Sequence, residues 1–215
     1  MYEFILFDLD GTLTDPAEGI TNSVAYSLAK YGIEVADKRE LYRFIGPPLK
    51  DSYMEYYGFS EQDAIEAIEY YREYFKPKGM FENEVYGGVP ELLNKLTEAG
   101  KKVILATSKP EVFSTEILKH FDLYKYFDFV SGATLDGTRS KKSDIIAYAL
   151  ENMGIEDRTK CLMVGDRAQD INGAIANGID SVGVLFGYGD RAELENAGAT
   201  YIAESVSDIL KIVMN

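Results

Sequence analysis

The sequence is poor in the residues from which many catalytic sites are built, with one cysteine and one histidine among 215 residues. A single cysteine excludes an internal disulfide, and one cysteine with one histidine cannot assemble a Cys/His zinc site. A Ser-His-Asp triad would have to rest on His120, which lies late in a helical pattern where a helix-end role is expected. Cys161 lies in an apolar run and is expected to be a small buried hydrophobe. The chemistry must therefore come from carboxylates, lysines, hydroxyl groups or a hard cation.

Positive charge is also scarce, since 22 lysines and arginines face 36 aspartates and glutamates, for a net charge of −14. An acidic surface repels nucleic acid and anionic membranes, so neither is expected as a partner. Exposed charges are screened over roughly 8 Å at physiological salt, so a local cationic pocket can still bind an anionic small molecule.

Long apolar runs are absent as well. No run approaches the roughly 20 residues of a membrane span, and the first residues lack the pattern of a secretory signal, so a cytoplasmic protein is expected. An apolar content of 46% is enough for one core with a smaller inserted domain. We expect a monomer or a homodimer.

Short apolar runs alternate with amphipathic stretches over most of the chain, which predicts βαβ units and a parallel sheet with helices on both faces. The expected strands are residues 3–8, 102–107, 127–131, 161–165 and 181–186. The expected helices are residues 89–99, 111–121, 142–153 and 169–177.

Residues 16–83 interrupt this alternation with tyrosine-rich stretches of helical spacing. They predict an inserted helical domain, with residues 1–15 and 84–215 forming the α/β domain. The expected hinges are Thr14–Pro16 and Glu82–Gly88. Asp15 followed by Pro16 and Glu18 is typical of a helix start, so Asp15 is expected to be an N-cap.

Two carboxylates, Asp8 and Asp10, follow the first apolar run directly. In an extended chain residues i and i+2 point the same way, so both face one side as the strand ends, and Gly11 then permits a tight turn. An ordinary acidic strand-to-turn junction is the alternative, because Asp-Gly is a common turn dipeptide.

A second acidic pair, Asp166 and Asp170, follows the strand expected at residues 161–165. If the turn after that strand is helical, the two carboxylates share a face and repel one another. The helix dipole compensates such a pair in part. A bound cation would compensate it better, and an oxygen-only ligand set points to Mg²⁺ rather than zinc.

Two further segments could serve an anion. The strand ending in Thr107 and Ser108 places hydroxyl and backbone N–H groups at a strand-to-helix junction, as phosphate sites do, although either residue could simply cap the next helix. Lys141 and Lys142 precede a helix, where positive charge is unfavourable to the dipole, although a solvated lysine pair is the commoner explanation. Ligands of open α/β sheets bind beyond the carboxyl ends of the strands, where these segments could converge with the two acidic pairs.

These segments, in this order, resemble the four motifs of the haloacid dehalogenase-like hydrolase superfamily. FDLDGTLTD carries the most specific motif, DxDGT; the Thr107 strand end, the Lys141-Lys142 helix start and GDRAQD match the others. The resemblance covers nearly the whole chain. It implies a Rossmann-like parallel sheet core with an inserted small α-helical cap domain. That cap type is found in the subgroup of phosphoglycolate phosphatases, β-phosphoglucomutases and some nucleotidases.

The resemblance also implies a mechanism. Asp8 is then the nucleophile that forms an aspartyl-phosphate, and Asp10 protonates the leaving alcohol and later activates water. Thr107, with Ser108 as a substitute, holds a phosphoryl oxygen. Lys142, preferred to Lys141 from its distance to the following helix, neutralises phosphoryl charge.

The cofactor implied by the same resemblance is Mg²⁺. It is held by Asp8, by Asp10 through its backbone carbonyl and by Asp166. Asp170 holds the metal through a water molecule or by a hydrogen bond to one of the metal's ligands.

Substrate choice in this family lies in the cap, and the segment expected to set it is FIGPPLK, residues 44–50. Gly46 lies in a rigid turn there, and Arg43 or Lys50 could meet a substrate anion. A plain turn between two helices is the equal alternative. Tyr188, in FGYGD near an expected sheet edge, is given no role.

The leading hypothesis is a Mg²⁺-dependent phosphatase of small phosphate monoesters, with phosphoglycolate and nucleoside monophosphates as first candidates. The alternatives are a phosphomutase of the β-phosphoglucomutase type and a non-catalytic binding protein on the same scaffold. Dehalogenases of the superfamily typically lack the second aspartate of the first motif, and Asp10 is present. A dinucleotide-binding oxidoreductase is disfavoured because no G-x-G-x-x-G follows the first strand.

Overall fold

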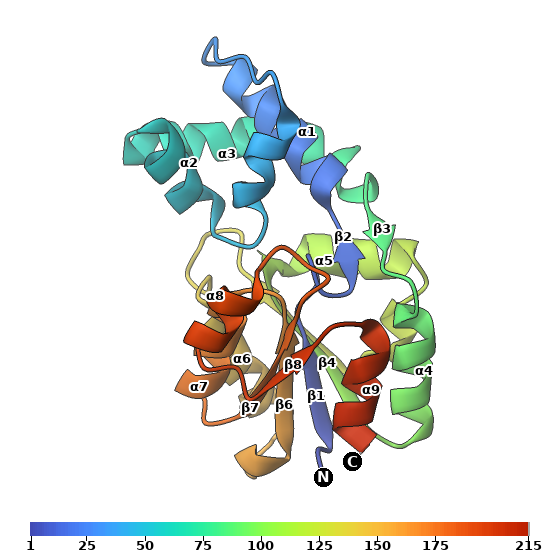
Figure 1. Cartoon of the computed structure of the whole chain (residues 1–215). Helices are drawn as coiled ribbons and strands as arrows, with labels where there is room; N and C mark the ends of the chain where they lie inside the picture. The colour runs from blue at the N-terminus through green and yellow to red at the C-terminus, as the bar shows by residue number, and fades with distance from the viewer. Residues whose placement is uncertain (215) are drawn as a thin grey trace. The chain divides into compact units, whose positions relative to one another are not determined.

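A computed structural model describes residues 1–214, and the chain divides into two compact units (Figure 1). The core unit comprises Met1–Asp15 and Val85–Asn215, and the inserted unit comprises Pro16–Glu84. The assignment of residues 1–15 and 84–215 as a hydrolase core and of residues 16–83 as a cap stays a prediction. No helix of residues 1–214 combines the length and the apolar character needed to cross a membrane.

The core unit is built on a six-stranded sheet of order β5-β4-β1-β6-β7-β8, in which every neighbouring pair is parallel. This confirms the expected α/β fold. The strands are β1 (Phe4–Phe7), β4 (Lys102–Pro110), β5 (Phe129–Ala133), β6 (Cys161–Gly165), β7 (Asp180–Val184) and β8 (Tyr201–Ala203). A separate two-stranded sheet contains β2 (Thr14–Asp15) and β3 (Glu84–Val85).

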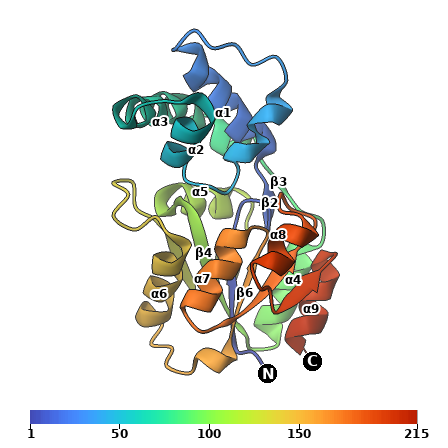
Figure 2. The same cartoon turned by 60° about the vertical axis from the view of Figure 1, so that its left-hand side comes forward.

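Helices cover both faces of the six-stranded sheet, as Figure 2 shows. The helices α6 and α7 lie side by side on one face with α8, and α4, α5 and α9 cover the other (Figures 1 and 2). The helices are α4 (Val89–Glu98), α5 (Glu111–His120), α6 (Lys142–Asn152), α7 (Ala168–Ala176), α8 (Arg191–Asn196) and α9 (Val206–Met214). Short 3₁₀ helices span Tyr124–Tyr126 and Arg158–Lys160.

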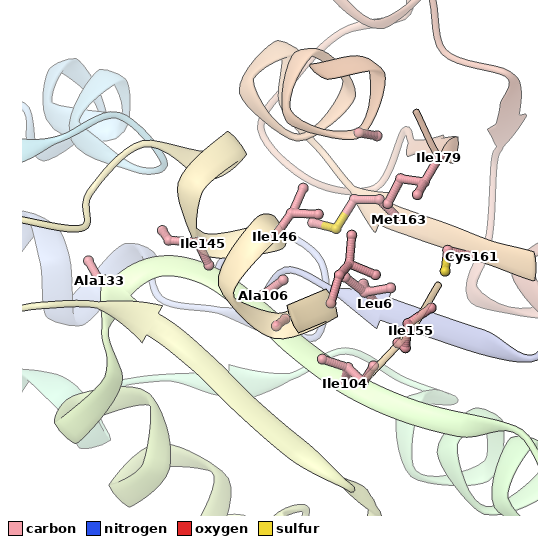
Figure 3. Packing of buried hydrophobic residues seen from close by; sticks show 13 residues of the cluster. Leu6, Ile104, Ala106, Ala133, Ile145, Ile146, Ile155, Cys161, Met163 and Ile179 are labelled. Atoms are coloured by element: carbon pink, nitrogen blue, oxygen red, sulfur yellow. The ribbon is translucent and has the colours of Figure 1, made fainter. Parts of the chain in front are cut away.

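The sheet is buried on both faces, which explains why its strands read as continuous apolar runs. Figure 3 shows one of the two layers, in which Leu6, Ile104 and Met163 from three adjacent strands pack against Ile145 and Ile146 of α6. Each of these side chains is buried, which stabilises the fold by about 1.5 to 3 kcal/mol per residue. Cys161 belongs to the same layer, so the expectation of a buried structural cysteine is correct.

The inserted unit is helical, with a core rich in aromatic rings. Tyr53 and Phe44 are fully buried, and Phe59 stacks on Tyr53 with ring centroids 5.7 Å apart. Its helices are α1 (Ala17–Ala29), α2 (Leu49–Tyr57) and α3 (Glu61–Phe75), with 3₁₀ helices at Lys38–Phe44 and Gly79–Phe81.

The start of α1 differs from the expectation. The N-cap position is Pro16, no side chain caps the helix there, and the expected N-cap role of Asp15 is wrong. The carboxylate of Asp15 instead accepts a hydrogen bond from the hydroxyl of Tyr188. A local helix signal was outweighed by a contact that spans 173 positions of the sequence.

Candidate active site

Asp8 and Asp10 lie at the point where the order of the parallel sheet reverses. β1 has β4 on one side and β6 on the other, so the chain winds outward in both directions from this strand. Ligands of open α/β sheets bind outside the carboxyl ends of the strands at such a switch point. Thr107 lies near the carboxyl end of β4, and Asp166 directly follows β6. The topology alone therefore brings both residues to the carboxyl end of β1.

The turn after β1 is tight and leaves no room for larger residues. Gly11 has φ of +80°, and a Cβ atom there would lie 2.2 Å from Oδ2 of Asp166. The backbone carbonyl of Leu9 accepts hydrogen bonds from the N–H groups of Thr12, Leu13 and Thr14, which closes the turn. The DxDGT spacing thus folds the chain back so that both carboxylates stay at the end of β1.

Three buried carboxylates meet beyond these strands. Asp8, Asp166 and Asp170 each offer an oxygen atom, and these atoms lie within 4.8 Å of one another. Burial raises the pKa of Asp166 well above its ordinary value, and the charges of Asp170 and Asp8 raise it further. Thr12 donates a hydrogen bond to Oδ1 of Asp166, and the backbone N–H of Tyr188 donates to Oδ2. The hydrogen bonds to Asp166 come from neutral groups, so they leave the negative charge of the three carboxylates uncompensated.

Lys142 lies within this cluster. Its Nζ atom is 2.9 Å from Oδ1 of Asp8 and 2.7 Å from Oδ1 of Asp170, and it also donates to the backbone carbonyl of Ala106. Burial by itself would lower the pKa of Lys142, but Asp170 and Asp8 outweigh burial and raise it. Lys141, which occupies the N-cap position of α6, is exposed. Of the two candidate lysines, the structure brings Lys142 to the cluster.

Lys109 is a buried cation that the sequence analysis did not single out. Its Nζ atom lies 2.7 Å from Oδ2 of Asp10, and both side chains are almost fully buried. β4 continues to Pro110, and both Thr107 and Lys109 are buried there, although the register with β5 shifts between Thr107 and Pro110. Because the expected strand ended at residue 107, Lys109 was not expected to reach the site.

The residues present fit a divalent cation. Asp8, Asp10, Asp166 and Asp170 carry four formal negative charges, and Lys109 and Lys142 supply two positive ones, which leaves two negative charges in a buried space. Oδ1 of Asp10 is buried and has no hydrogen-bond partner among residues 1–214. Oxygen ligands of this kind suit Mg²⁺, which prefers carboxylates and water.

Thr107 and Ser108 lie on β4, next to β1. Thr107 is buried, and its hydroxyl oxygen accepts a hydrogen bond from the backbone N–H of Lys109 at 3.2 Å. An oxygen that accepts from the backbone keeps its own proton available for another acceptor. Ser108 is half-buried.

The three candidate substrate residues of the inserted unit are placed differently from one another. Arg43 is exposed, and its guanidinium lies over the rings of Tyr56 and Tyr57, at 4.4 and 5.6 Å from their centroids. Gly46 has φ of +102°, which favours glycine, and Lys50 forms an exposed ion pair with Glu61 at 2.7 Å. Their role in substrate choice stays a prediction.

The buried position of Asp170 gives a testable dependence of stability on pH. Burial raises the pKa of Asp170 to about 6, and the charge of Asp8 acts in the same direction against the opposing effect of Lys142. Between its unfolded value of 3.8 and about 6, the folded protein then binds the proton more strongly than the unfolded chain. Stability from this group is therefore lost as pH rises through that window.

We expect the stability of the metal-free protein, measured relative to Asp170→Asn, to fall by about 3 kcal/mol between pH 4 and pH 7, which is roughly two pKa units. Urea unfolding of both proteins in chelator at several pH values measures this difference. Asparagine keeps an acceptor for the N–H of Arg167 at the start of α7, so the comparison isolates the charge. A difference that stays constant or rises with pH would contradict the assignment.

Comparisons with known proteins agree with this geometry. A family model described as haloacid dehalogenase-like hydrolase matches residues 5–184. A 5'-nucleotidase of Pseudomonas aeruginosa is 44% identical over 212 residues, which is 99% of this chain and 96% of that protein. The tyrosine-protein kinase PtkA of Mycobacterium tuberculosis is 36% identical over 95% of this chain and 69% of its own length.

A solved structure is similar over the full length of the chain. The crystal structure of a predicted phosphatase from Clostridium acetobutylicum superposes with a TM-score of 0.97 at 53% identity, and the match covers 100% of this chain and 99% of that one. The arrangement of the strands therefore belongs to a known architecture.

Proposed function

The chain belongs to the haloacid dehalogenase-like hydrolase family, and from that premise we propose that it is a Mg²⁺-dependent phosphatase of small phosphate monoesters. The expectation of a phosphatase of this family is confirmed by its relatives; the metal and the substrate are proposed here. The observation that carries the proposal is the buried cluster of Asp8, Asp10, Asp166 and Asp170 with two lysines, because its remaining charge suits a cation and a phosphoryl group together.

In the first step, a carboxylate oxygen of Asp8 attacks phosphorus and the bond from phosphorus to the ester oxygen breaks. Lys142 holds Oδ1 of Asp8, which leaves the other oxygen for the attack. The leaving alkoxide takes a proton from Asp10, whose pKa burial raises against the opposing effect of Lys109. A raised pKa favours the protonated carboxyl that this step requires.

In the second step, water attacks the aspartyl-phosphate and Asp10 takes a proton from that water. Inorganic phosphate leaves and the carboxylate of Asp8 is restored, so atoms and charges balance over the cycle. The hydroxyl of Thr107 donates to a phosphoryl oxygen, and Lys142 balances the charge that develops on it.

The metal would be held by Asp8, by Asp166 and by the backbone carbonyl of Asp10, with Asp170 acting through water. When bound, Mg²⁺ neutralises charge on the phosphoryl oxygens and fixes their orientation. The orientation of its ligands comes from the chain itself, since Thr12 and the N–H of Tyr188 each hold one oxygen of Asp166.

Nucleoside 5′-monophosphates are the first substrates to test, because a relative at 44% identity carries the name of a 5'-nucleotidase. Phosphoglycolate is the second. Arg43 or Lys50 is the proposed contact for an anionic group of the substrate, and Gly46 permits the turn between them.

Release of free phosphate across a panel of monoesters tests the proposal. We expect turnover with Mg²⁺ that is lost in chelator and recovered when Mg²⁺ is restored. The panel contains nucleoside 5′-monophosphates, 2-phosphoglycolate, hexose phosphates, phosphotyrosine and p-nitrophenyl phosphate. Since another relative is named as a tyrosine kinase, transfer from ATP to tyrosine is measured in parallel.

The alternatives give different results. A phosphomutase would isomerise a hexose phosphate in the presence of a bisphosphate primer and release little free phosphate. A binding protein would bind a phosphorylated metabolite without turning it over. Absence of phosphate release from every member of the panel, with Mg²⁺ present, would overturn the phosphatase.

A further inference from the structure

The loop that follows β7 packs so closely against Asp166 that two of its glycines could not carry a side chain. A Cβ atom at Gly187 would lie 2.4 Å from Cβ of Asp166, and one at Gly189 would lie 2.0 Å from its backbone oxygen. Between these two glycines, the backbone N–H of Tyr188 donates to Oδ2 of Asp166 at 2.8 Å. The segment Phe186–Asp190 therefore fixes the position of one carboxylate of the acidic cluster.

The same loop also reaches the two places where the chain enters and leaves the inserted unit. The hydroxyl of Tyr188 donates to Oδ1 of Asp15, the last residue of the core unit before the insertion. Phe186 packs edge to face against Tyr86, just after the insertion, with ring centroids 5.3 Å apart. Tyr86 also contacts the linker, which is the segment Leu13–Asp15 that leads into the inserted unit. The backbone N–H of Tyr86 donates a hydrogen bond to the carbonyl of Leu13.

We propose that Tyr188 is a positioning residue that couples the metal site to the linker: its backbone holds Asp166 while its hydroxyl holds Asp15. The inference rests on the proposed metal site and deepens it. A hydrogen bond from a hydroxyl to a carboxylate is a strong one, so Asp15 of the linker restrains the loop. The restrained loop in turn holds Asp166 in the position in which it would bind the cation. Coupling between two sites is reciprocal, so a cation on Asp166 must also stabilise the bond at Asp15.

The test uses Tyr188→Phe, which removes the hydroxyl and keeps the ring and the backbone N–H. Calorimetric titration with Mg²⁺, without substrate, is expected to show binding about fivefold to tenfold weaker than in the wild type. Tyr86→Phe is the matched control, since it removes a neighbouring hydroxyl that has no hydrogen bond among residues 1–214 and keeps the ring pair with Phe186. It is expected to bind Mg²⁺ as the wild type does.

A double-mutant cycle of Tyr188→Phe with Asp15→Ala tests whether the hydroxyl of Tyr188 affects Mg²⁺ binding through its hydrogen bond to Asp15 or in some other way. If the hydroxyl acts through Asp15, the double variant binds Mg²⁺ no more weakly than either single variant, because each change breaks the same bond. Hydrogen exchange supplies a second readout. Mg²⁺ is expected to slow amide exchange at residues 13–15 and 17 of the wild type. Tyr188→Phe is expected to lose that slowing, while residues 165–170 keep theirs.

The outcomes separate this inference from the proposed function. If Mg²⁺ binds and protects residues 165–170 but Tyr188→Phe binds it as tightly as the wild type, the coupling is overturned and the metal site stands. Additive losses in the double variant would overturn it as well. If Mg²⁺ does not bind the wild type, both the metal site and the coupling fail.

Discussion

Replacing Asp8 by asparagine is expected to lower the rate of phosphate release by roughly 10⁴-fold or more, the scale seen when a covalent nucleophile is removed. Asparagine has the same shape, and the backbone N–H of residue 8 still donates to the carbonyl of Val164, so β1 and its turn should be unchanged. The neutral amide is a far weaker nucleophile than the carboxylate. Initial rates with Mg²⁺ and the best substrate of the panel measure the effect.

The matched control is Asp144→Asn, which removes the same charge two residues after Lys142 on the exposed side of α6. It should leave the rate within a factor of about two, since an exposed charge outside the cluster is screened. Substantial phosphate release by Asp8→Asn would show that another group attacks phosphorus. In that case the order of the two steps proposed above would have to be abandoned.

Replacing Lys142 by methionine is expected to affect both activity and stability. Without the ammonium, Asp8 and Asp170 lose the cation that pairs with them in a buried site, and breaking a buried pair in this way costs about 3 to 5 kcal/mol. The phosphoryl group also loses the cation that balances its developing charge, which corresponds to a loss of about 10²- to 10³-fold in rate. Urea unfolding in chelator and initial rates with Mg²⁺ measure the two effects separately.

Lys141→Met is the control that this chain offers, because the neighbouring lysine is exposed. It should change the free energy of unfolding by no more than about 0.5 kcal/mol. Mg²⁺ should restore much of the stability of Lys142→Met, since a cation would supply charge at the same carboxylates. If the two lysine variants behaved alike, Lys142 would not be the residue that neutralises the site.

Much of the core unit could be predicted because its sheet is buried on both faces. The strands that contain Leu6, Ile104 and Met163 are short continuous apolar runs, and their length and their alternation with amphipathic stretches favour buried strands over helices. The strand Tyr201–Ala203 was missed because it is three residues long and begins at an exposed tyrosine. The helices α8 and α9 were not predicted either.

The acidic part of the candidate site was accessible to sequence reasoning because each residue lies beside a strand end. The two-residue spacing of Asp8 and Asp10 and the order of the four segments were sufficient to place them. The contacts of Lys109 with Asp10 and of Tyr188 with Asp15 were not accessible in this way. Each joins side chains that are far apart in the sequence, and no local pattern specifies such a partner.

The central place of β1 also affects how the chain can fold while it is being synthesised. β1 precedes both of its partners, and the register that pairs Phe4 with Cys161 joins residues 157 positions apart. At a synthesis rate of about 5 to 20 residues per second, roughly 8 to 30 s pass before β6 can cover that edge. The inserted unit is a compact unit made of one continuous segment, Pro16–Glu84, so it can fold during that interval. One edge of the apolar strand FILF therefore stays unpaired for that time, even after β4 has been synthesised and can cover the other edge.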